Sequence, residues 1–278
     1  MDQTTSHWDA VRRHWDLLGP PLRPPPEAVA AYRRALGWSD EIVMLGVTPE
    51  LATIGRKLTA IDQSPQMIAG IWPGDTDMRR AIIGDWLGMP VERDSATAII
   101  GDGCLSALGS SGERRRLFRE IARVLRPDGR AVVRTFASPD RPEDPAAIRT
   151  LAMTATAGTF HALKWRIAMA CAAADPGRAI PVGTILKAFN RLFPDRDALA
   201  SANGWPLPVI GTIDVYARSE TVYSFATVAM LSAEAAECFN DVDVVSSGDY
   251  AFSEHCPLMV LNRPRKPEAK PDEFDRAS

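Results

Sequence analysis

The sequence predicts an α/β protein built on a doubly wound, mostly parallel seven-stranded sheet with an antiparallel last strand. Short apolar runs alternate with helix-like segments five times between residues 41 and 136, as in parallel sheets whose strands are buried on both faces. A mainly helical insertion then interrupts the alternation. Two apolar runs near the carboxyl end are joined by a loop too short for a crossover helix, so we expect them to pair antiparallel.

Composition narrows the class of protein. The chain has 278 residues, 46% of them hydrophobic and 24% charged, with a formal net charge of −3, which is typical of a globular protein. The slightly acidic balance argues against a nucleic-acid partner. The four cysteines lie far apart in the sequence, so we expect reduced thiols and no metal site. The sequence has no apolar stretch of membrane length and no secretory signal, so we expect a cytoplasmic protein with no membrane partner. The sequence leaves open whether the protein forms a homodimer.

The first forty residues predict a helical cap. Residues 7–18 place Trp8 and Trp15 at helical spacing, and we favour a core role for both. The prolines between 20 and 26 predict a stiff connector. A second helix should begin at Pro26 and stop near Gly37.

Residues 41–137 predict the core of the sheet. Strands are expected at 42–47, 57–62, 81–83, 98–100 and 130–136. Helices are expected at 49–56, after a Ser64 cap, and at 112–125. The arginines of this last segment are mostly interpreted as a solvated face.

Residues 138–278 are predicted to form three segments. Residues 138–218 predict a substrate lid with helices at 145–173 and 182–193. Residues 219–263 should complete the sheet with a helix at 227–239 and strands at 242–245 and 258–261. The charged, proline-containing tail, 264–278, is expected to be disordered.

Polar and glycine residues follow four strand ends in succession. Gly46 follows the first strand, Asp62 ends the second, Asp85 follows the third, and Gly101–Gly103 follow the fourth. Each has a structural alternative, namely a tight turn, a helix cap, a turn acid and a flexible loop. Ligands of open parallel sheets bind beyond the carboxyl ends of the strands, so the ordered series favours a binding site.

The segments "VMLGVTPELA", "LTAIDQSPQMI", "AIIGDWLGMPVERDSATAIIGDG" and "VLRPDGRAVVRTF" resemble class I, Rossmann-like S-adenosylmethionine-dependent methyltransferases. The resemblance implies that Asp62 binds the ribose hydroxyls, that Asp85 and Trp86 flank the adenine, and that Gly101–Gly103 lie near the sulfonium. It implies S-adenosyl-L-methionine as cofactor. The predicted cofactor-binding residues are Leu45, Gly46, Val47, Thr48, Glu50, Asp62, Gln63, Met67, Gly84, Asp85, Trp86, Gly101, Asp102 and Gly103.

The first loop departs from the family pattern. Only Gly46 remains of its usual glycines, and Met44 stands where an acidic residue is usual. Thr48 and Glu50 are candidates to replace the missing contacts to the amino-acid end of the cofactor.

The function predicted from the resemblance is methyl transfer to a small-molecule acceptor by in-line displacement. The alternative is a non-catalytic, methyltransferase-like protein that senses a ligand or binds a partner, which the reduced first loop favours. If the acceptor is protonated, the candidate bases are His161, His255 and Tyr223. Tyr216 is an alternative to Tyr223. A lone histidine is more often structural. Trp165 and Trp205 are candidates to roof an apolar pocket.

Overall fold

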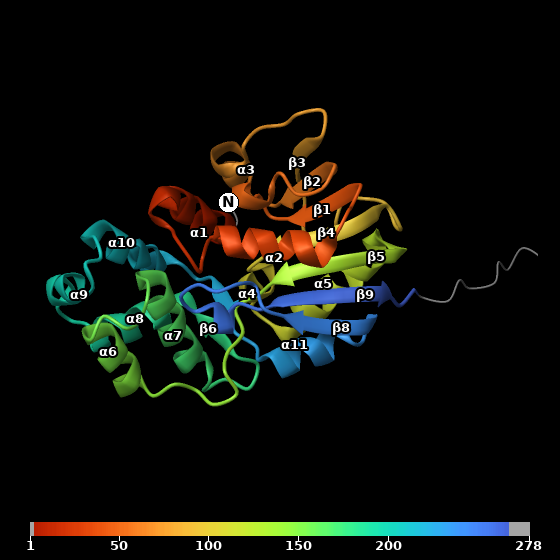
Figure 1. Ribbon diagram of the computed structural model, residues 1–278. Coiled ribbons are helices and arrows are strands. Elements are labelled where there is room, and N and C mark those ends of the chain that lie inside the picture. Colours follow the sequence, from red (N-terminus) through yellow and green to blue (C-terminus); the bar gives the residue numbers. More distant parts are fainter. Residues whose placement is uncertain (1–2, 267–278) are drawn as a thin grey trace, which may run out of the picture.

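The computed structural model describes residues 3–266, with side chains described from His7 onward. Its main sheet has seven strands in the order β3-β2-β1-β4-β5-β9-β8 (Figure 1). Only β9 runs antiparallel, between β5 and the edge strand β8. The predicted fold class is confirmed. The strands are β1 (Glu41–Leu45), β2 (Lys57–Asp62), β3 (Arg79–Ile83), β4 (Ala96–Asp102), β5 (Leu125–Arg134), β8 (Phe239–Val245) and β9 (Leu258–Pro264).

Helices cover both faces of this sheet. On one face α2 (Pro26–Leu36) and α3 (Pro65–Ile71) share an apolar cluster with β1 and β2. On the other face α5 (Ser111–Val124) and α11 (Val228–Ala235) pack against β4 and β5. The predicted cap of α3 is confirmed, because the Ser64 hydroxyl accepts a hydrogen bond from the Met67 amide at 3.2 Å. The short helix α4 (Cys104–Ala107) follows β4 directly.

Three predicted helices are shorter than expected, and the one predicted over 227–239 is α11, which ends at Ala235. The segment 49–56 forms only a 3-10 turn, Pro49–Leu51, because Gly55 turns the chain with a φ of +77°. The predicted helix over 7–18 divides into α1 (Gln3–Arg12) and a 3-10 turn at Trp15–Leu17. The indole of Trp15 is half-buried and packs against the apolar cluster of α2, β1 and β2.

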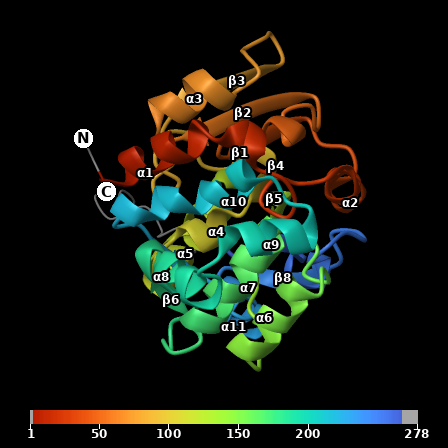
Figure 2. The ribbon, with the colours of Figure 1, turned by 90° about the vertical axis from the view of Figure 1, so that its left-hand side faces the viewer.

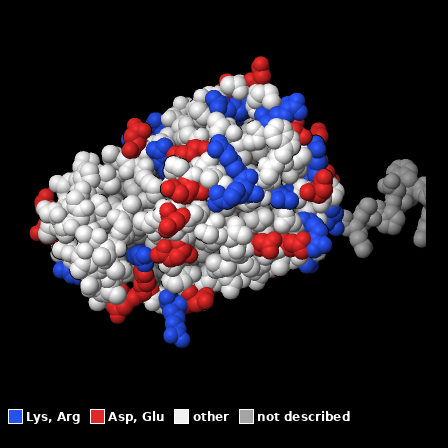
Figure 3. Space-filling model, viewed as in Figure 1, with Lys and Arg blue, Asp and Glu red and all other residues white. Residues whose placement is uncertain are grey.

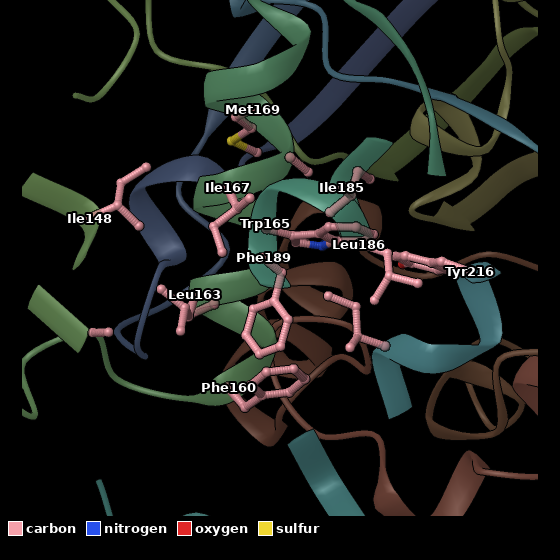
Figure 4. Packing of buried hydrophobic residues seen from close by; sticks show 14 of the residues in the cluster. Ile148, Phe160, Leu163, Trp165, Ile167, Met169, Ile185, Leu186, Phe189 and Tyr216 are labelled. Carbon is pink, nitrogen blue, oxygen red and sulfur yellow. The ribbon is translucent and has the colours of Figure 1, made fainter. Parts of the chain in front are cut away.

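The insertion forms a helical lobe beside the carboxyl ends of the parallel strands (Figures 1 and 2). The predicted helix over 145–173 is interrupted at Ala155 and Gly158, both with positive φ. Its apolar residues form a core of their own, which includes Phe160, Phe189 and Trp165 (Figure 4). The lobe contains α6 (Pro145–Met153), α7 (Phe160–Ala172), α8 (Val182–Leu192), α9 (Arg196–Asn203), α10 (Leu207–Gly211), a 3-10 segment (Thr212–Arg218), and the strand pair β6 (Ala179–Pro181) and β7 (Val222–Ser224).

One arginine of α5 corrects the predicted solvated face. Arg114 is buried and donates to both carboxylate oxygens of Glu234 on α11, at 2.7 and 2.8 Å, and to the Ser224 hydroxyl at 2.7 Å. A charge this far from water needs such a partner. The partner lies 120 residues away in the sequence, so the local charge pattern could not reveal it.

The surface seen in Figure 3 carries both signs of charge over the sheet, and it is mostly uncharged over the helical lobe. Within residues 3–266, no helix is long and apolar enough to cross a bilayer. All four cysteines are free thiols. The predicted disordered tail lies outside the described residues, except for its first residues up to Lys266. The predicted division into domains stays a prediction.

Candidate functional site

A cavity of about 880 Å³ lies where β1, β2, β3 and β4 end, and the helical lobe and the α1 segment form its other walls. It gathers most of the residues that the sequence predicts to bind a cofactor. Glu50 and Gly101 are the two exceptions among them. The predicted residues that line the cavity are Leu45, Gly46, Val47, Thr48, Asp62, Gln63, Met67, Gly84, Asp85, Trp86, Asp102 and Gly103.

Gly46, Asp62 and Trp86 form one corner of this cavity. Gly46 adopts a φ of +91°, a conformation that favours glycine. A Cβ there would lie 3.5 Å from the Trp86 ring and 3.9 Å from Asp62 Oδ2. The indole of Trp86 is fixed because its Nε1 donates to the Ile61 carbonyl at 2.7 Å. The corner therefore offers an open carboxylate oxygen beside a held aromatic ring.

Asp62 carries the polar chemistry of this corner. Its Oδ1 accepts the Ser64 amide at 2.8 Å, which leaves Oδ2 available to a ligand. Burial raises the pKa of the carboxyl from 3.8 to about 6, although the Ser64 amide opposes the shift. The group is thus mainly ionised at neutral pH and can accept hydrogen bonds from hydroxyl groups.

Asp85 acts as the predicted turn acid and also lines the cavity. Its Oδ1 accepts the Leu87 amide at 2.9 Å, as expected of a turn acid. The residue is exposed and also lines the cavity next to Trp86. A donor group on a ring packed against Trp86 would find the second oxygen of this carboxylate within the same wall.

The segment Gly101–Gly103 differs from its predicted role in part. Gly101 does not line the cavity, because its Cα faces the Cys104 sulfur, which an added Cβ would meet at 2.8 Å. The Asp102 carboxylate is bound by the buried guanidinium of Arg134, at 2.5 and 2.9 Å. Tyr32 donates to the Gly101 carbonyl at 2.6 Å. Asp102 therefore fixes the end of β4 against β5 and has no free carboxylate oxygen for a ligand.

The reduced first loop is supplemented from the amino-terminal cap. Arg23 lines the cavity and forms a salt bridge to Glu50 at 2.5 Å. Its guanidinium also lies 5.4 Å from the Trp15 ring centroid. The second oxygen of Glu50, Oε2, is buried and has no hydrogen-bond partner among the described residues. An orphaned buried oxygen beside a guanidinium suits a ligand that carries an amine and a carboxylate.

The opposite wall of the cavity is aromatic. Trp165 and Tyr216 come from the helical lobe and lie near one another in Figure 4. Tyr223 of β7 and Phe136 complete this wall. Trp8 and Trp15, for which the sequence favours a core role, are half-buried and also line the cavity. Trp205 packs on the core of the lobe and not in this wall.

The candidate bases are not brought together. Tyr223 lines the cavity, but its hydroxyl is 2.8 Å from His7 Nε2, and burial raises its pKa. His161 is buried against the Leu17 carbonyl at 3.0 Å, and burial lowers its pKa to about 3. His255 lies 3.2 Å from the Ala137 carbonyl, and burial lowers its pKa too. Neither histidine lines the cavity, because both face backbone carbonyls.

Sequence reasoning did not identify two cationic residues of the cavity wall, Arg23 and Lys164. Arg23 lies within a proline-rich run whose path depends on packing. Lys164 is one of only two charged residues in the otherwise apolar helix α7, and that contrast was the available signal. The described residues contain no group of three or more His, Cys, Asp or Glu side chains that could hold a metal ion.

Comparisons with known proteins agree with this geometry. Residues 46–133 match the family model described as a methyltransferase domain. An N-methyltransferase, NodS from Bradyrhizobium japonicum, solved with S-adenosyl-L-homocysteine, is 14% identical over 94% of this chain and 100% of its own, with a TM-score of 0.51. A Rhodobacter sphaeroides protein with the provisional designation of zinc-dependent alcohol dehydrogenase is 11% identical over 95% and 98% of the two chains, with a TM-score of 0.59. No curated protein matches significantly.

At such low identity the solved structures establish the fold alone. Residues 46–133 match a methyltransferase domain, and the solved structures share the Rossmann-like fold that the strand-end motifs predict. The recognition made from the strand-end motifs is confirmed. S-adenosyl-L-methionine is the cofactor that the resemblance predicts for such a domain.

Proposed function

We propose that the protein is an enzyme that transfers a methyl group from S-adenosyl-L-methionine to a small-molecule acceptor by in-line displacement. One observation carries the proposal. A single cavity joins a corner suited to a nucleoside, at Gly46, Asp62 and Trp86, to an aromatic wall suited to an acceptor.

The residues of the sheet edge fit the cofactor. Asp62 Oδ2 is available to the two ribose hydroxyls, and the open space at Gly46 admits the sugar. Trp86 and Asp85 provide an adenine with a ring to pack on and an acceptor for its amine. Arg23 lines the cavity and is available to the carboxylate of the methionyl end, and Glu50, which does not line the cavity, holds the guanidinium of Arg23 by their salt bridge.

The bound cofactor supplies a methyl group activated by its sulfonium. The chain then has to hold the acceptor atom close to that methyl group and in line with the breaking bond, and positioning of this kind can supply much of the rate enhancement. The helical lobe places its side of the cavity opposite the nucleoside corner. Because the walls come from both sides, a small acceptor can be enclosed and water reduced around the reacting atoms.

Calorimetric titration with S-adenosyl-L-homocysteine tests this proposal. We expect saturable binding by the native protein and binding weakened at least tenfold in Asp62→Ala, because a buried hydrogen-bonded carboxylate contributes more than about 1.4 kcal/mol to such contacts. Asp77→Ala, which changes an exposed acid outside the cavity, is the matched control. Absence of binding at millimolar ligand would remove the proposal. Binding without transfer to any acceptor of a small-metabolite panel would favour a non-catalytic sensor.

A further inference from the structure

Lys164 is a buried amine in the wall of the cavity. Only 3% of its surface is exposed, yet the residue lines the cavity. Its Nζ lies 5.3 Å from the ring centroid of Trp165 and 5.3 Å from that of Tyr216. Within residues 7–266 it forms no salt bridge and burial is the only cause of its pKa shift, so no carboxylate of this part of the chain compensates its charge. Buried lysines without such a partner are rare.

The groups that face Lys164 cannot serve as its counterion. His7 of α1 shares hydrogen bonds with Tyr223 and Ser219, both at 2.8 Å. Burial and then the charge of Lys164 lower the pKa of His7 to about 4, and they act on His161 in the same direction. Burial raises the pKa of Tyr216 and Tyr223. At neutral pH all four neighbours are therefore uncharged.

The electrostatic consequence is an amine that gains and loses its proton near neutrality. Burial lowers the pKa of Lys164 from 10.5 to about 7. Such an amine is present partly as the free base, the form that can accept a proton. A cationic ligand in the same cavity adds repulsion that favours this free base further.

Unpartnered polar atoms lie in the same wall. Trp165 Nε1 and Thr221 Oγ1 are buried, belong to residues that line the cavity, and have no hydrogen-bond partner among the described residues. Buried donors of this kind are rarely left unpaired. Together with the amine of Lys164, they give an otherwise aromatic wall a set of unpartnered polar groups, which suits an acceptor that carries a polar atom.

We propose that Lys164 is the general base of the reaction and that the acceptor is a phenol or a similarly acidic hydroxyl on a planar ring. This inference rests on the proposed function. A neutral aromatic hydroxyl can enter a wall of aromatic rings without bringing a charge out of water. An ammonium acceptor would add a second positive charge to the cavity wall at Lys164, whose amine pairs with no carboxylate within residues 7–266; Glu113 and Glu220 line the same cavity without pairing with it. A carboxylate acceptor needs no base at all.

The proton and electron balance of the step is complete. The lone pair of Lys164 Nζ takes the hydroxyl proton while the acceptor oxygen forms its bond to the methyl carbon. The bond between that carbon and the sulfur breaks, and its electron pair stays on the sulfur. The site holds one positive charge before the step and one after it, now as the ammonium of Lys164 over the rings of Trp165 and Tyr216. That ammonium then releases its proton to solvent.

The test is a methyl-transfer assay with labelled S-adenosyl-L-methionine and ring-matched acceptors, namely a series of phenols of decreasing pKa, aniline and benzoate. We expect the native protein to methylate phenols, with kcat rising as the pH increases through about 7. Lys164→Met should lower kcat by about 10²-fold or more for weakly acidic phenols, the usual contribution of a general base. The loss should shrink for 4-nitrophenol, which is already ionised at mildly alkaline pH. A purely structural role would not produce this graded rescue.

The controls separate this inference from the proposed function. Lys187→Met changes an exposed lysine of α8 outside the cavity and should leave kcat unchanged. Lys164→Gln serves as a second variant, and circular dichroism reports the fold of each. Three results with a protein that binds S-adenosyl-L-homocysteine would overturn the role of Lys164: an unchanged pH profile in Lys164→Met, methylation of aniline or benzoate only, or no phenol methylated. Failure to bind that ligand would instead defeat the proposed function.

Discussion

Replacing Lys164 by methionine should stabilise the fold at neutral pH while it impairs methyl transfer. Folding takes the lysine from a pKa of 10.5 to about 7, because it loses its hydration without gaining a counterion. Each pKa unit corresponds to about 1.4 kcal/mol, so charging the buried amine costs at most about 5 kcal/mol. Methionine has a similar shape and no charge, so it removes that cost and keeps most of the packing.

The sign of the pH dependence follows from proton binding. Between pH 7 and 10.5 the unfolded chain holds the lysine proton and the folded chain does not, so the stability of the native protein should rise with pH across this window. Below pH 7 both states hold the proton, and the native protein carries the full cost. The stabilisation by Lys164→Met should therefore be largest below pH 7 and should decrease towards pH 10.5.

Urea unfolding of both proteins at a series of pH values measures this difference directly. The slope of the native protein relative to Lys164→Met is the informative quantity, because contributions of the other titrating groups largely cancel. If Lys164→Met were less stable than the native protein at pH 7, or if the difference did not vary with pH, the reasoning about an uncompensated buried amine would be refuted. Lys187→Met should follow the native protein at every pH.

Three further predictions concern the cofactor corner and the fold. Affinity for S-adenosyl-L-homocysteine should fall by about tenfold per pH unit below pH 6, because Asp62 then takes up its proton, and calorimetry on Asp62→Asn should show weak binding without that dependence. Arg23→Met or Glu50→Gln should weaken this ligand by about tenfold or more yet leave adenosine binding unchanged; equal losses for both ligands would contradict their assignment to the methionyl end. Arg114→Met should lower the free energy of unfolding by about 3–5 kcal/mol, because it leaves the buried carboxylate of Glu234 without its partner. The double variant with Glu234→Met should recover most of this loss, as measured by urea unfolding.

The strands could be predicted because each depends on a local pattern. The run Ile42–Leu45 is continuous and apolar, as a strand buried on both faces requires. The antiparallel pairing of β8 and β9 follows from the length of their connecting loop. The corner formed by Gly46 and Asp62 could be predicted too, because parallel strands bring their carboxyl ends to one edge of the sheet.

The other half of the cavity depends on packing between distant segments. Arg23 reaches Glu50 from a proline-rich run 27 residues earlier in the chain. The charge of Lys164 lowers the pKa of His7 only because the fold brings α7 and α1 to the same cavity. Asp102 lies at a strand end as expected, but its carboxylate forms a salt bridge with Arg134 on the neighbouring strand β5. No periodicity in the sequence reports which of these charges is paired, and pairing decides which of them can bind a ligand.

A crystal structure with bound S-adenosyl-L-homocysteine is the most direct test of the whole account. It should show both ribose hydroxyls on Asp62, the adenine beside Trp86, and the amino-acid end at Arg23, which Glu50 holds. The sulfur should face the part of the cavity that Lys164 lines. A ligand bound outside this cavity, or one whose adenine occupies the wall at Lys164, would contradict it.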